Sequence, residues 1–121
     1  MTITVAAHPM NSLIFVSDPA GGVVPEWERD KSILSTRSCI SVICYPEQDG
    51  PTQITLGPRV EVDPRTPAAF EGILETPHRA VVIHTVDQQI LMKSAVRSGR
   101  TRIAIWLSHP RWPERVTIGL D

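Results

Sequence analysis

The sequence has no long apolar run, and it contains little cysteine. A membrane-spanning helix needs about 20 consecutive apolar residues, and no stretch of the 121 residues approaches that length. The first residues also lack the basic and apolar segments of a secretory signal. Cys39 and Cys44 lie five positions apart in one apolar run. A strand would place them on opposite faces, where they could not bridge each other. These absences predict a soluble protein of the reducing cytoplasm.

The sequence also lacks the motifs that usually indicate catalysis or cofactor binding. It contains no GxSxG, no phosphate-binding P-loop and no GxGxxG. No histidine lies within two to five positions of another, although ligands in small metal-binding domains are commonly spaced that closely. The four are His8, His78, His84 and His109. The sequence therefore predicts no enzyme activity, no metal site and no cofactor.

Neither sign of charge dominates the whole chain, but the charges are unevenly distributed along it. The net charge is −1, with −5 carried by residues 1–78 and +4 by residues 79–121. Two segments of the second part, RSGRTR and HPRWPER, suggest phosphate contacts combined with base stacking. The residues concerned are Arg97, Arg100, Arg102, Arg111, Arg115 and Trp112. Nucleic-acid-binding domains are usually clearly basic, so the sequence predicts that nucleic acid is not the partner.

Alternating and β-branched apolar runs are what the sequence has in abundance. Residues 79–107 contain three such runs, separated by the short breaks DQQ and RSGR. Side chains of a strand alternate between two faces, so runs of this kind predict strands. The short breaks favour hairpins. The segment is therefore predicted to be a three-stranded meander at the heart of the fold.

Further strand patterns occur on both sides of this segment. Gly57-Pro58 interrupts one of them and predicts an edge strand or a bulge there, because proline has no N–H to donate. The predicted strands outside the meander are residues 2–7, 13–16, 39–45, 52–62, 70–75 and 115–120. Nearly all of the eleven prolines lie between such runs. We expect a single all-β domain, residues 1–121, forming a two-layer antiparallel β-sandwich of about eight to nine strands. A closed barrel is the alternative.

Residues 25–35 form the one segment with a helical pattern. Pro25 suits the first position of a helix, and Glu26 and Glu28 suit its first turn. Trp27 and Leu34 would share one face and cap an end of the sheet core. The pattern predicts at most one short helix, and a loop with a single helical turn is the alternative.

The three tryptophans indicate how the protein could bind a partner. Trp106 lies within a strand pattern and is predicted to be a core residue, whereas Trp112 lies between two prolines and could either cover the core or face a partner. Aromatic side chains anchor interfaces, and carboxylates accelerate association with a basic partner. The predicted partner-binding residues are Glu26, Trp27, Glu28, Asp30, Asp49 and Trp112.

The order of several segments resembles a known group of proteins. Trp27, a short acidic segment, the strand CISVICY and later strands ending in GRTRIAIW follow one another between Val23 and Leu107. This order is similar to that of small bacterial β-sandwich proteins of the competence protein J type. The resemblance implies an inhibitor that binds a nuclease, comparable in role to immunity proteins against toxins. The N-terminal strands and HPRWPERVTIGL depart from that pattern, so no interface residue is carried over.

Two functions follow from these observations. The first is a binding protein that acts through another protein, in its sharpest form an inhibitor or immunity protein for a basic nuclease or toxin. The second is a small-molecule-binding or enzymatic sandwich with a cleft near His84, His109 and Trp112.

Overall fold

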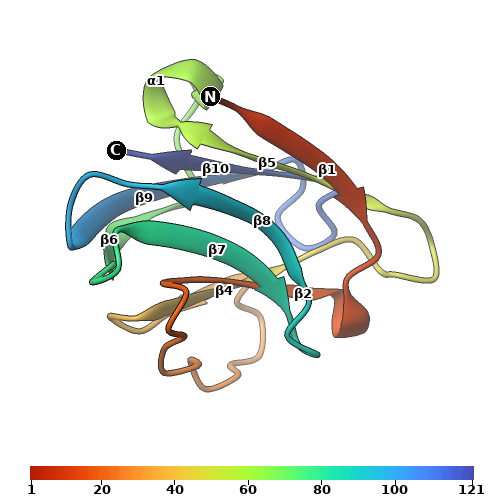
Figure 1. Ribbon diagram of the computed structural model, residues 1–121. Coiled ribbons are helices and arrows are strands. Elements are labelled where there is room, and N and C mark those ends of the chain that lie inside the picture. The colour runs from red at the N-terminus through yellow and green to blue at the C-terminus, as the bar shows by residue number, and fades with distance from the viewer.

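The computed structural model describes residues 1–121 and consists of two five-stranded sheets packed face to face (Figure 1). One sheet has the strand order β1-β5-β10-β9-β6, and the other has the order β3-β4-β2-β7-β8. The strands are β1 (Ile3–Ala7), β2 (Leu13–Ser17), β3 (Ile33–Ser35), β4 (Cys39–Ile43), β5 (Thr52–Pro58), β6 (Phe70–Glu75), β7 (Ala80–Thr85), β8 (Ile90–Ala95), β9 (Arg100–Leu107) and β10 (Arg115–Leu120). A 3-10 turn, η1 (Met10–Ser12), and a four-residue helix, α1 (Arg59–Val62), complete the secondary structure. No helix is long and apolar enough to cross a membrane.

All neighbouring strands run antiparallel except β5 and β10, which are parallel. The predicted all-β, two-layer antiparallel sandwich is therefore confirmed. There are ten strands, one or two more than predicted, and only one short helix. The parallel pair forms because β10 inserts between β5 and β9.

The core lies between the two sheets and follows the two-residue period of the strands. Alternate residues of each internal strand point inward, such as Ile14 and Val16 from β2 and Ile103 and Ile105 from β9. All four side chains are fully buried. Burying an aliphatic side chain of this size contributes about 1.5–3 kcal/mol, so these alternating positions carry much of the stability.

The predicted meander is wrong in its third strand. β7 and β8 pair as a hairpin, but β9 leaves them and lies in the opposite sheet between β10 and β6. The Thr76 N–H donates to the Gly99 carbonyl, and the Thr76 and Thr101 hydroxyls lie 2.8 Å apart. These bonds join the start of β9 to the end of β6. A short polar break between two strands is equally compatible with a hairpin and with a change of sheet.

The predicted edge strand at residues 52–62 is also wrong. β5 is internal, with β1 on one side and β10 on the other, and it ends at Pro58. Pro58 is the last residue of the strand and the N-cap of α1, so its missing N–H breaks no internal ladder. A Cβ on Gly57 would lie 3.1 Å from Val62 Cγ1, and one on Gly119 would lie 3.2 Å from Arg59 Cα. The two glycines allow α1 to pack against the outer face of the sheet.

The segment from Arg59 to Ala69 explains why Trp106 is buried. Trp106 points to the outer face of its sheet, away from the core between the sheets, yet only 6% of it is exposed. Its Nε1 donates to the Thr66 carbonyl at 2.9 Å, and the Arg59 guanidinium lies 5.7 Å from the ring centre. Trp106 is therefore buried, as predicted, but under this connection and not in the core between the sheets.

Residues 25–35 do not form the predicted helix. They form an extended connection that ends in β3, and Asp30 has a φ of 69°. That left-handed conformation is incompatible with a continuous helix. Trp27 is 74% exposed, so it does not cap the sheet core as predicted.

Candidate protein-binding surface

The connection between β2 and β3, residues 18–32, projects from the sandwich next to β2 and β4 (Figure 1, orange). It is anchored at its start by Asp18, which is 2% exposed. The Asp18 carboxylate accepts hydrogen bonds from Ala20 N at 2.9 Å, from His78 N at 2.8 Å and from His78 Nδ1 at 2.7 Å. Burial raises the pKa of Asp18, but these hydrogen bonds together hold it below its ordinary value.

The middle of the connection runs against the turn between β3 and β4. Val23 N donates to Ser38 Oγ at 2.8 Å, and Thr36 Oγ1 donates to the Val23 carbonyl at 2.6 Å. A Cβ on Gly22 would lie 2.1 Å from the Ser38 carbonyl oxygen, so only glycine allows this approach. The chain is therefore held in place immediately before Trp27.

The end of the connection is joined to the loop between β9 and β10. Arg111 Nη2 lies 3.0 Å from Asp30 Oδ1, and the Ser32 hydroxyl donates to the Pro110 carbonyl. Trp27 precedes this junction by three residues, and Trp112 follows Arg111 directly. We call residues 23–32 and 109–113 together the tryptophan surface. It brings two of the tryptophans singled out in the sequence into neighbouring loops.

Large apolar side chains are unusually exposed on the tryptophan surface. Trp27 is 74% exposed and Trp112 is 55% exposed. Val23 and Val24 are 69% and 54% exposed in the same segment. Contiguous exposed apolar groups on a folded protein are typical of interaction sites. Interface hot spots are enriched in tryptophan.

The charges of this surface are mixed, whereas the sequence suggested a cluster of free carboxylates. Glu28 pairs with Lys31 at 3.4 Å, and Asp30 pairs with Arg111. Glu26 takes part in none of the ion pairs of the structure. Among the predicted acidic residues of this segment, Glu26 is thus the one whose charge is not already matched within the surface.

Asp49, the remaining predicted partner residue, lies in the turn between β4 and β5. Its N–H donates to the Pro46 carbonyl at 2.9 Å, and its side chain is exposed. The turn lies at the same end of the sandwich as the loop of Trp112, because Gln53 N donates to the Glu114 carbonyl beside it. No hydrogen bond or ion pair joins Asp49 to the tryptophan surface.

The predicted cleft near His84, His109 and Trp112 is not formed. His84 stacks on Phe15 at 5.3 Å between ring centres, and its Nε2 lies 3.2 Å from Ser17 Oγ on the outer face of the sheet. His109 Nδ1 accepts hydrogen bonds from Arg111 N and Trp112 N and so shapes its own loop. The five best-defined cavities are lined by other residues.

Neither cysteine is placed for nucleophilic chemistry. Both are free and buried, with Cys39 on the outer face of β4 and Cys44 in the core. Burial raises the pKa of Cys39 to about 11 and that of Cys44 to about 12. Both thiols therefore stay protonated at neutral pH and are poor nucleophiles. No group of three or more His, Cys, Asp and Glu residues is arranged to hold a metal ion.

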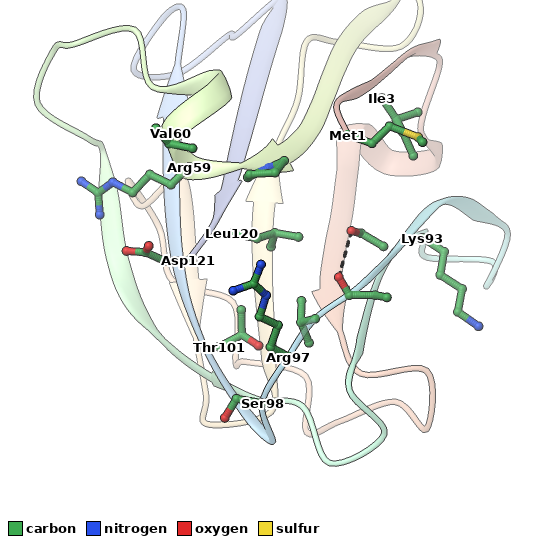
Figure 2. A pocket seen from close by; sticks show the side chains of 14 residues that line it. Met1, Ile3, Arg59, Val60, Lys93, Arg97, Ser98, Thr101, Leu120 and Asp121 are labelled. Atoms are coloured by element: carbon green, nitrogen blue, oxygen red, sulfur yellow. Dashed lines mark hydrogen bonds between the residues drawn. The ribbon is translucent and has the colours of Figure 1, made fainter.

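A cavity of about 560 Å³ that the sequence did not predict opens at the opposite end of the molecule from the loop of Trp112 (Figure 2). Ile3, Val96 and Leu120 contribute apolar walls. The Arg97 side chain points into it, whereas those of Arg59 and Lys93 point away. Arg59 instead pairs with Glu71 at 2.6 Å, which raises the pKa of the guanidinium. The lining comes from segments distant in sequence, so no local pattern could have predicted it.

Comparison with known proteins gives one informative result. No protein family and no curated protein matches the sequence. Among solved structures, the chain is similar to ComJ from Bacillus subtilis, an inhibitor of the DNA-degrading activity of NucA, with a TM-score of 0.65. The two chains share a fold. The likeness covers 99% of this chain and 93% of ComJ at 10% sequence identity.

The resemblance to the competence protein J type is therefore confirmed at the level of the fold. It is broader than the sequence suggested, because it includes the N-terminal strands and the segment around Trp112. At this identity the ComJ fold carries no information on individual interface residues.

Proposed function

We propose that this chain is an inhibitory binding protein that contacts a nuclease or toxin through the tryptophan surface. The observation that carries the proposal is Trp27, which is 74% exposed on a connection tethered before and after it. A large exposed ring on a constrained loop loses little conformational entropy when it binds. The ComJ-like fold supports the inhibitory role. The role of an immunity protein in a bacterium is the narrower form of the same proposal.

Trp27 supplies the anchor in this proposal, and Glu26 supplies the electrostatic attraction. Hot-spot tryptophans typically contribute at least about 2 kcal/mol to binding. A carboxylate next to such an anchor raises the association rate with a basic partner. Glu28 and Asp30 contribute less, because each already has a cationic neighbour. Trp112 and Asp49 extend the proposed contact toward the end of the sandwich.

Affinity capture tests the proposal directly. The immobilised protein is incubated with lysate of the cells that produce it, and the eluate is assayed for degradation of DNA and RNA. We expect the wild type to retain a nuclease, and added free protein to suppress that nuclease. Trp27→Ala should reduce the capture at least about 10-fold. An eluate without degrading activity, or one that the free protein fails to inhibit, would contradict the proposal.

A matched control separates the anchor from general surface hydrophobicity. Ile90 is 63% exposed on β8, outside the tryptophan surface. Ile90→Ala should leave the capture unchanged. With the captured nuclease purified, Glu26→Gln should slow association at low salt and have little effect at high salt, because exposed charges are screened over about 8 Å at physiological ionic strength. If Glu28→Gln slowed association as much as Glu26→Gln, the ion pair with Lys31 would not weaken the attraction of Glu28 for the partner.

A further inference from the structure

Three turns carrying exposed arginines meet at the end of the sandwich opposite the loop of Trp112 (Figure 1, left). They connect β3 to β4, β6 to β7 and β8 to β9. Backbone hydrogen bonds join them: Glu75 N donates to the Arg37 carbonyl, Thr76 N to the Gly99 carbonyl and Val96 N to the Arg79 carbonyl. The arrangement is therefore set by the backbone and not by flexible side chains alone.

The charge of these turns is strongly positive. We call the four exposed arginines there the arginine pole: Arg37, Arg79, Arg97 and Arg100. None of them takes part in an ion pair. The acidic groups nearby are Glu75, opposite Arg100 in the β6–β9 register, Asp18, which is buried and bonded to His78, and Asp121, which lines the same cavity as Arg97. A solvated cluster of this kind attracts anions despite the net charge of the whole chain.

We propose that the arginine pole is a binding site for the phosphate backbone of nucleic acid. Guanidinium groups recognise phosphate through paired N–H donors. Arg79 Nη1 already lies against the β8–β9 turn, where it donates to the Arg97 carbonyl at 3.2 Å. Arg97 itself reaches toward the cavity of Figure 2. The Ser98 hydroxyl on the same turn accepts from Arg100 N and keeps its own proton available for donation.

The composition of the pole distinguishes nucleic acid from an acidic protein. A protein interface needs a desolvated apolar or aromatic centre, and none of the large exposed apolar side chains belongs to these three turns. Phosphate contacts require only cations and hydrogen-bond donors. The three turns carry no Phe, Tyr or Trp, and the one ring there, His78, is bonded to Asp18. With no large ring on which bases could stack, we expect binding to be independent of sequence.

This assignment differs from the nucleic-acid alternative suggested by the sequence. Arg111 and Arg115 lie with Trp112 at the other end of the molecule, so the basic segments RSGRTR and HPRWPER do not form one surface. The arginine pole instead combines Arg97 and Arg100 with Arg37 and Arg79, which neither basic segment contains. Trp112 lies at the end of the sandwich opposite the arginine pole, and the tryptophan surface meets the pole at Val23, which is bonded to Thr36 and Ser38 on either side of Arg37.

Fluorescence anisotropy with a labelled duplex DNA of about 20 base pairs and random sequence tests the assignment. We expect a dissociation constant of about 10 μM at low salt and a slope of log K against log[salt] of about −3.6, which corresponds to about four phosphates, one for each arginine of the pole. The variant R37Q/R97Q/R100Q should bind at least about 10-fold more weakly, with a slope near −1. Arg79 is retained because its side chain donates to the Arg97 carbonyl and so holds the neighbouring turn.

The variant R65Q/K93Q/R115Q removes the same charge from three exposed basic residues outside the pole and outside the tryptophan surface, and it is the control. Its affinity should remain within about threefold of wild type. Equal weakening of both variants, or no binding by the wild type at low salt, would overturn the assignment. Competition by poly-glutamate as effective as that by unlabelled DNA would also overturn it, in favour of an acidic polypeptide. Because the assay contains no nuclease, its outcome does not depend on the inhibitory role.

Discussion

Individual apolar residues in this protein differ sharply in what they contribute. Ile105 is fully buried between the sheets, while Trp112 is 55% exposed at the tip of a loop. Removing a buried side chain leaves a cavity that the surroundings fill only in part. Removing an exposed ring leaves no internal cavity, because water can occupy the space. The larger residue is therefore the less important of the two for folding.

We expect Ile105→Ala to lower the free energy of unfolding by about 2–5 kcal/mol. Trp112→Ala should lower it by less than about 1 kcal/mol, as most exposed substitutions do. Denaturant titrations followed by circular dichroism measure both values. Similar large losses in the two variants would place the Trp112 ring against the core and remove it from the proposed interface.

At the scale of single elements, one carboxylate holds the start of the connection 18–32 against the β6–β7 turn. Asp18 accepts three hydrogen bonds in a site that water does not reach. Its pKa is lowered in the folded protein. The stabilisation is thus fully present above the ordinary carboxyl pKa of about 4 and is lost as the pH falls through the lowered value.

Asp18→Asn should therefore lower the free energy of unfolding by roughly 2 kcal/mol at neutral pH. The difference from wild type should shrink as the pH falls toward about 3. Melting temperatures recorded across that range provide the measurement. Asp49→Asn, at an exposed carboxylate without an ion pair, is the control and should not alter the pH profile. A constant difference at every pH would mean that the shape of the side chain matters and its charge does not.

Elements also show how far the sequence determined the fold. The strand patterns correctly predicted β6 and β10, where one face is more exposed than the other, and also β4 and β7, whose nearly continuous apolar runs are buried on both faces. They could not predict that β9 changes sheet, since pairing depends on contacts with β6 and β10. The helical pattern at residues 25–35 failed because long-range bonds fix both sides of the segment, through Val23 to the β3–β4 turn and through Asp30 and Ser32 to the β9–β10 loop.

The candidate site shows the same division between local and long-range information. Trp27 could be singled out by its acidic neighbours, although a helix was predicted there, and Trp112 by its place between two prolines. Their loops are joined by Asp30 and Arg111, which are 81 positions apart in sequence. The same ion pair removes part of the negative charge that the sequence attributed to this segment. A separation of that length leaves no periodic or local signal.

At the scale of the whole molecule, the two cysteines lie in different parts of the sandwich, so their reactivity can show how it opens. Cys39 lies on the outer face of one sheet, and Cys44 lies in the core between the sheets. Both thiols are buried, and their raised pKa values suppress the reactive thiolate. Exposure of both at once requires the sandwich to open as a unit.

We therefore expect both thiols to be inert to Ellman's reagent in the native protein at pH 8. In a guanidinium titration, their reactivity should rise together with the loss of β signal, as a cooperative transition requires. The single variants Cys39→Ala and Cys44→Ala identify which thiol reacts. Reaction of Cys39 well before the β signal changes would reveal separate opening of the outer face.

The position of β10 has a consequence for how the protein is made. On the ribosome, residues 13–95 supply every strand of the sheet β3-β4-β2-β7-β8 before β10 has been translated. The other sheet lacks its third strand until Leu120 is translated, so the β1–β5 pair and the β9–β6 pair remain separate, with β5 and β9 each missing one neighbour. Unpaired strand edges in a nascent chain favour aggregation and chaperone binding. The insertion of β10 is thus a late folding step, in which the β1–β5 and β9–β6 pairs are joined into one sheet.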